Sequence, residues 1–133
     1  ANDFAVFRAF CDAEIAMSAH VLFESIDPYS PASTSKKLMD IIRNEIKFSG
    51  LLISDDISMA ALPGDIKKRT KNLIEAGNDV ILHCNGKLFE MKEIIYTGVV
   101  PNTLTLSRMA SVIEERKKIK HNKTNCVKTS QSS

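Results

Sequence analysis

Three short apolar runs, each followed by a segment with helical periodicity, constrain the fold of this chain more than any other feature. The runs lie at residues 14–22, 51–54 and 79–83, and the helical segments at 35–47, 65–76 and 88–95. A short helix over 3–10 and a final helix over 106–118 complete the pattern. Strands that alternate with helices predict an α/β fold with a parallel sheet and helical crossovers. Part of a (β/α)8 barrel and a small doubly wound sheet both fit, although a complete barrel needs about 250 residues.

The second apolar run ends in two adjacent carboxylates, Asp55 and Asp56. Ligands of α/β proteins bind in the crevice above the carboxyl ends of the strands, so these acids are the first candidates for a catalytic residue. Neighbouring residues of a strand point to opposite faces of the sheet. Asp55 shares its face with Leu51 and Ile53, and Asp56 lies on the other face, so only one of the two acids can face a substrate.

The helix boundaries are marked by local signals. Thr34 or Ser35 is expected to cap the helix that follows the first strand. We expect Gly50 to take a left-handed conformation where that helix ends. Gly77 follows the end of the next predicted helix.

Composition excludes several classes of protein. The chain has 133 residues, which suffices for one domain with a core, and its formal net charge of +2 gives no electrostatic case for a nucleic acid partner. The apolar runs are far shorter than the roughly 20 residues of a membrane helix, and no signal peptide pattern is present. The three cysteines are widely spaced and odd in number. They are expected to be reduced thiols of a cytoplasmic protein that holds no metal.

The two ends of the chain differ in character. The chain starts with Ala1 and enters an amphipathic segment at once, so we expect an upstream part to be missing. Residues 119–133 are rich in Lys, Asn, Ser and Thr and nearly free of large apolar side chains. They are predicted to form a disordered basic and polar tail, which leaves residues 1–118 as the folded part.

Five segments of the chain form a distinctive set. They are Met17-Ser18-Ala19-His20-Val21, Ile26-Asp27-Pro28, Pro31-Ala32-Ser33, Phe48-Ser49-Gly50-Leu51-Leu52-Ile53-Ser54-Asp55-Asp56-Ile57-Ser58-Met59 and Glu75-Ala76-Gly77-Asn78-Asp79. The Phe-x-Gly-x-x-x-Ser-Asp-Asp core is the most specific of them. In order and spacing, over roughly residues 3–95, these segments resemble bacterial β-N-acetylhexosaminidases of glycoside hydrolase family 3.

The resemblance implies a fold and an activity. The family has a (β/α)8 barrel, so the three strands are expected to be its last three, and residues 1–118 an incomplete barrel. Its nucleophile corresponds to Asp55, and Asp56 is expected to cap the following segment or bond backbone N–H groups. The implied reaction is retaining hydrolysis of terminal N-acetylglucosaminides from peptidoglycan during cell-wall recycling. The implied partner is this carbohydrate substrate, with no cofactor, metal, membrane or nucleic acid.

Two parts of the family's active site are missing from this sequence. The family places its acid/base, a His supported by an Asp, on an earlier loop, and it carries an upstream Lys-His-Phe-Pro-Gly-His-Gly stretch. Because neither occurs here, the isolated chain is predicted to be inactive, and the sequence assigns no substrate-binding residue. His20 is interpreted as a supporting histidine rather than a sugar contact, and Met59 as either a packing residue or a sugar contact.

Three interpretations therefore stay open. The first is a hexosaminidase fragment that carries the nucleophile. The second is a non-catalytic remnant or interaction half-barrel, and the third a doubly wound signalling domain with Asp55 as phosphoacceptor. Open parallel edges invite pairing, so an N-terminal half in trans or a second copy is expected to complete the sheet.

Overall fold

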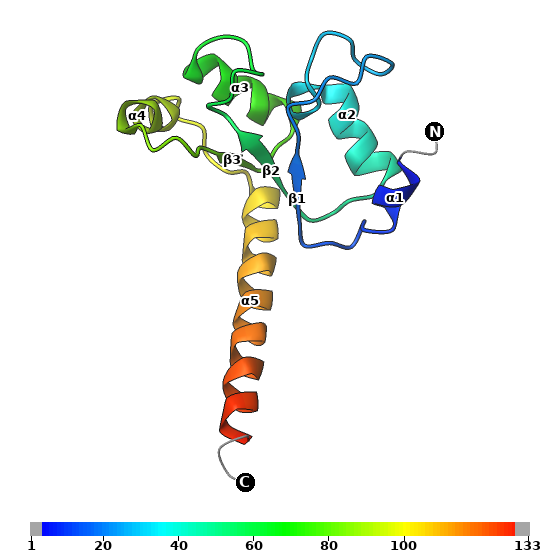
Figure 1. Ribbon diagram of the computed structural model, residues 1–133, viewed down its shortest axis with the longest axis vertical. Helices are drawn as coiled ribbons and strands as arrows, with labels where there is room; N and C mark the ends of the chain where they lie inside the picture. The colour runs from blue at the N-terminus through cyan, green and yellow to red at the C-terminus, as the bar shows by residue number, and fades with distance from the viewer. Residues whose placement is uncertain (1–3, 130–133) are drawn as a thin grey trace.

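The computed structural model describes the backbone of residues 4–129 and the side chains of residues 4–118. It contains a three-stranded parallel sheet in the order β1-β2-β3, formed by β1 (Ile15–Ser18), β2 (Leu51–Asp56) and β3 (Val80–Leu82). β1 pairs with β2 from Ile15 opposite Leu51 to Ser18 opposite Ser54. The predicted α/β class with parallel strands is thus confirmed (Figure 1).

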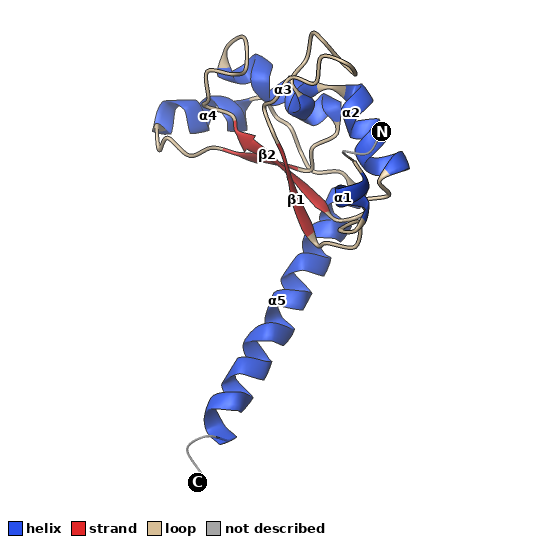
Figure 2. Cartoon of the chain, turned by 45° about the vertical axis from the view of Figure 1, so that its right-hand side comes forward, coloured by secondary structure: helices blue, strands red, loops and turns tan. Residues whose placement is uncertain are grey.

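Helices pack against one face of the sheet, and α5 extends away from one end of it (Figure 2). They are α1 (Ala5–Arg8), the 3-10 helix η1 (Ala32–Thr34), α2 (Lys36–Asp40) with its π-helical continuation η2 (Ile41–Glu45), α3 (Ile66–Ala76), α4 (Leu88–Tyr96) and α5 (Thr103–Thr129). Side-chain caps start two of them. Ser35 accepts from the N–H of Leu38 at 3.3 Å, and Asp65 accepts from the N–H of Lys68 at 2.8 Å.

The core lies between the sheet and its covering helices. Leu52 packs there with residues of α2, η2 and α3, and a second cluster gathers around Ile57, Leu62 and Leu73. On the other face of the sheet, Leu51 of β2 is buried, whereas the side chains of β1 are largely exposed. On that face Ile15 and Met17 are 37% and 57% exposed. Residues of β1 alternate between the two faces, as strand geometry requires.

Gly50 does not take the left-handed conformation that was predicted for it, and that prediction was wrong. Lys47 turns the chain instead, with a φ of 65°. A Cβ at Gly50 would collide with the carbonyl oxygens of Ala13 and Glu14. Gly50 is therefore needed for close approach of two backbone segments rather than for its φ angle.

Helix α5 extends well past Lys118, where the sequence predicted that it would end. It projects away from the sheet as one long helix (Figure 1). Residues 119–129, predicted to belong to a disordered tail, continue this helix, and residues 130–133 lie outside the described residues. The chain contains no Gly or Pro after Pro101, so no residue breaks the helix. None of the helices described is long and apolar enough to cross a membrane.

Candidate active site

Asp55 and Asp56 are the last two residues of β2, the central strand of the sheet. The carboxylate of Asp56 binds the loops that follow β2 and β3. Its Oδ1 accepts from the N–H groups of Ser58 and Cys84, both at 3.0 Å, and its Oδ2 accepts from the Ser58 hydroxyl at 2.6 Å. These contacts are of the kind expected for Asp56 from the sequence, and they occupy both of its oxygens.

The surroundings of Asp56 keep it ionised. Burial by itself raises the pKa of this carboxyl. Hydrogen bonds from the Ser58 hydroxyl and from the N–H groups of Ser58 and Cys84 outweigh burial, so the pKa lies below its ordinary value. Asp56 is therefore a carboxylate anchor that joins two loops at the carboxyl end of the sheet.

Asp55 precedes Asp56 in β2, at the point between Ile53 and Asp56 where the register with β3 shifts. Its Oδ1 accepts from the N–H of Asp56 at 2.8 Å. Within the described part of the chain, its Oδ2 has no hydrogen-bond partner, and the side chain is only half-buried. Hydrogen bonding thus distinguishes the two acids, because among the described residues only Asp55 keeps a carboxylate oxygen without a partner. The assignment of the two acids to opposite faces by strand parity stays a prediction.

His20 lies beside the acid pair, two residues after the end of β1. Its Nδ1 is 2.6 Å from the Ser33 hydroxyl, and its Nε2 is 3.0 Å from the carbonyl oxygen of Asp56. Both ring nitrogens of His20 are therefore engaged by groups of the chain itself.

A side chain of α3 binds the loop that follows Asp55 and Asp56. Arg69 donates through one guanidinium nitrogen to the carbonyls of Ile57 and Met59, at 3.0 and 3.1 Å. The Met59 side chain is 42% exposed, so it is not part of the core. Met59 therefore does not serve as a buried packing residue in this structure.

His83 and Cys84 follow β3 at the same edge of the sheet. The Nε2 of His83 lies 2.9 Å from Glu90 Oε2, and the Cys84 side chain is exposed. Among the residues whose side chains are described, no three His, Cys, Asp or Glu side chains gather as a metal site would require. The Nε2 of His83 therefore contacts α4 through Glu90.

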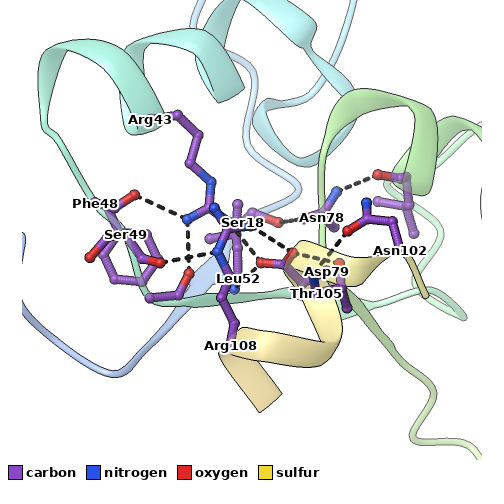
Figure 3. A network of polar contacts seen from close by, with 12 residues as sticks. Ser18, Arg43, Phe48, Ser49, Leu52, Asn78, Asp79, Asn102, Thr105 and Arg108 are labelled. Atoms are coloured by element: carbon purple, nitrogen blue, oxygen red, sulfur yellow. Dashed lines mark hydrogen bonds and ion pairs between the residues drawn. The ribbon is translucent and has the colours of Figure 1, made fainter. Parts of the chain in front are cut away.

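A buried polar cluster around Asp79 lies at the amino end of β3 and was not identified from the sequence (Figure 3). Asp79 pairs with Arg43 at 2.7 Å and with Arg108 at 2.8 Å. It also accepts from the N–H of Leu52 and the Thr105 hydroxyl, both at 2.9 Å. Sequence patterns give no sign of this cluster, because its members come from four separate segments.

Asn78, beside Asp79, is a second buried residue that sequence reasoning did not single out. Its side-chain amide donates to the carbonyls of Ser33 and Leu73 at 2.7 Å, and its Oδ1 accepts from Ser18 at 2.6 Å. Asn78 thereby ties β1, η1 and the end of α3 together. Figure 3 shows its contact with Ser18.

Comparison with known sequences agrees with this arrangement. Residues 1–116 match the profile described as Glycosyl hydrolase family 3 N terminal domain. A curated β-hexosaminidase of Nitrosomonas eutropha is 39% identical over 88 residues, which cover 63% of this chain and 25% of that protein. The chain spans about a quarter of the length of such curated relatives.

Solved structures show the same fold. NagZ from Neisseria gonorrhoeae superposes with a TM-score of 0.67 and 31% identity, covering 80% of this chain and 31% of that one. A glycoside hydrolase family 3 β-N-acetylglucosaminidase from a Paenibacillus species superposes with a TM-score of 0.76 over 86% of this chain and 25% of that one. At 23% identity, the second comparison supports the fold alone.

Proposed function

The chain belongs to glycosyl hydrolase family 3, and on that basis we propose that it is the nucleophile-bearing part of a retaining β-N-acetylhexosaminidase. The observation that carries the proposal is the position of Asp55. It lies at the carboxyl end of the central strand and has one carboxylate oxygen without a partner among the described residues. Asp56, in contrast, is fully occupied by Ser58 and Cys84.

The chemistry follows from a carboxylate in that position. Asp55 attacks the anomeric carbon, the glycosidic C–O bond breaks, and a glycosyl ester forms between the sugar and Asp55. Water then hydrolyses the ester and releases the sugar with its original configuration. The reaction needs a second group that protonates the leaving oxygen and later activates the water, about 5 Å from the nucleophile.

Neither of the two histidines whose side chains are described offers an exposed ring nitrogen without a partner for that second role. His20 uses both ring nitrogens, and the His83 side chain is 8% exposed and paired with Glu90. We therefore assign the acid/base to the part of the enzyme that this chain does not span, since its relatives are about four times as long as the matched region.

The substrate class rests on the relatives. They are named β-hexosaminidase and β-N-acetylglucosaminidase, so the proposed substrates are terminal N-acetylglucosaminides. Within that class we propose peptidoglycan fragments, cleaved in the cytoplasm during cell-wall recycling without a cofactor.

The fold is proposed to be the last three strand–helix units of an eight-stranded barrel, within residues 1–118. Three observations support an incomplete barrel. Ile15 and Met17 of β1 are exposed, and an apolar groove of about 490 Å³ runs along β1 beside Phe7 and Phe10. In the described structure, β1 and β3 each pair with only one strand.

An uncovered edge of this kind predicts association. Sedimentation velocity of the chain is expected to show dimers or larger species, or a complex when an N-terminal half is supplied in trans, because apolar strand edges pair with other chains. A stable monomer with a cooperative unfolding transition would contradict this prediction.

The experiment for the activity uses a substrate that does not need the missing acid. Dinitrophenolate leaves without protonation, so a dinitrophenyl N-acetyl-β-glucosaminide tests the nucleophile separately from the acid/base. The chain, alone and with an N-terminal half in trans, is expected to release about one dinitrophenolate per molecule in a burst, because covalent intermediates accumulate when their hydrolysis is slow. Mass spectrometry is expected to place an N-acetylhexosamine on the peptide that contains Asp55.

The same experiment separates the alternatives. No burst and no adduct in either setting would favour a non-catalytic remnant. An adduct on another residue would remove Asp55 from the nucleophile's role.

A further inference from the structure

The peptide group between Asp56 and Ile57 is held on both of its sides. Its carbonyl oxygen lies 3.0 Å from the Nε2 of His20, and its N–H donates to the carbonyl of Leu82 at 2.9 Å. The contacts come from the loop after β1 and from β3, so the segments at the carboxyl ends of all three strands meet at this peptide group. Ile57 itself is fully buried, which keeps water away from its N–H.

This peptide group lies one residue from the carboxylate proposed to react. The N–H of Asp56 donates to Oδ1 of Asp55 at 2.8 Å. The direction of that N–H depends on the backbone of Asp56, whose other end is the carbonyl that faces His20. A shift of the Asp56 backbone would therefore move the donor that orients the Asp55 carboxylate.

His20 is well placed to prevent such a shift, because it is itself fixed. The residue is 9% exposed, and its Nδ1 lies 2.6 Å from the Ser33 hydroxyl. The Ser33 carbonyl in turn accepts from the buried Asn78 amide at 2.7 Å. A carbonyl oxygen can only accept, so the Nε2 of His20 carries the proton and donates to Asp56, and in the neutral ring Nδ1 accepts from Ser33.

We propose that His20 is a positioning residue for Asp55. Its Nε2–H holds the Asp56 carbonyl and thereby keeps the Asp55 carboxylate in the orientation from which it attacks. The inference rests on the proposed function of Asp55, but the contact that it depends on can be measured without turnover.

Two variants at this position separate hydrogen bonding from packing. His20→Gln keeps a side-chain N–H donor that can reach the Asp56 carbonyl, and His20→Leu fills the site without a donor. Thr70→Val is the matched control, because Thr70 is also buried and bonds only the Ile66 carbonyl within α3. It removes a buried hydroxyl without touching the acid pair.

The first measurement is the rate of the dinitrophenolate burst. His20→Leu is expected to slow it by about 10²-fold, the scale of a misplaced reacting group, with little change in KM. His20→Gln is expected to restore most of the rate. The proposal is overturned if Leu and Gln variants lose the same activity, or if the loss in His20→Leu equals that in Thr70→Val at matched thermal stability.

The second measurement is amide hydrogen exchange at Ile57, which needs no activity. Exchange is expected to accelerate in His20→Leu beyond any global loss of stability, and to stay slow in His20→Gln and Thr70→Val. Unchanged exchange in His20→Leu would overturn the proposal. Faster exchange with an unchanged burst rate would also overturn it, since the contact would then be only structural. A wild-type chain without a burst would refute the proposed function of Asp55, and the exchange data would still decide whether His20 holds this peptide.

Discussion

Asp55→Asn is expected to reduce the dinitrophenolate burst by roughly 10⁴-fold or more, the scale on which removal of a covalent nucleophile acts in other enzymes. The amide has almost the shape of the carboxylate, and its oxygen can still accept from the N–H of Asp56, so the chain should stay folded. The measurement is the burst amplitude and rate, together with the thermal midpoint of the variant.

Asp65→Asn is the matched control for this substitution. Asp65 is an exposed acid that caps α3, and asparagine caps helices equally well. The control is expected to keep the wild-type burst. Some hexosaminidases use the acetamide of the substrate instead of an enzyme nucleophile. A full burst in Asp55→Asn without a covalent adduct would indicate that route.

Asp79→Asn is expected to lower the free energy of unfolding by about 3–5 kcal/mol, the usual cost of removing one partner from a buried ion pair. The Asp79 side chain is 4% exposed, and it neutralises Arg43 and Arg108, whose side chains are 19% and 17% exposed. Without the carboxylate, two largely buried guanidinium groups would face each other. Denaturant unfolding of wild type and variant measures the loss.

The stabilisation of the fold by Asp79 is expected to decrease as the pH falls. Burial raises the pKa of this carboxyl, but hydrogen bonds from the Leu52 N–H, Thr105 and Arg108 outweigh burial and hold the pKa below its ordinary value of 3.8. A lowered pKa stabilises the folded state above about pH 4, and the stabilisation is lost as the pH falls through the folded-state pKa. The difference between wild type and Asp79→Asn is therefore expected to shrink below pH 4.

Glu93→Gln provides the comparison for an exposed ion pair. Glu93 lies 3.6 Å from Lys67, and both side chains are solvent-accessible. Its substitution is expected to change the free energy of unfolding by less than about 1 kcal/mol. Similar losses for Asp79→Asn and Glu93→Gln would contradict the view that Asp79 joins α5 to the sheet.

Features that depend on neighbouring residues were predicted well. Each predicted strand and helix is present, and Ser35 caps its helix. Gly50 shows the limit of such reasoning. A glycine after a helix suggests a left-handed turn. Here the glycine is required instead because the distant backbone of Ala13 and Glu14 approaches too closely for a Cβ.

The sequence by itself determined the alternation of strands and helices and the family, because periodicity, caps and motifs are encoded within a few residues. It also supplied the proposal of Asp55 as the nucleophile. Only the tertiary structure decided how that acid is supported. His20 reaches Asp56 across 36 positions, Arg43 reaches Asp79 across 36, and Ser18 reaches Asn78 across 60. Such contacts form only when parallel strands bring their ends together, since each crossover separates neighbouring strands by a full helix.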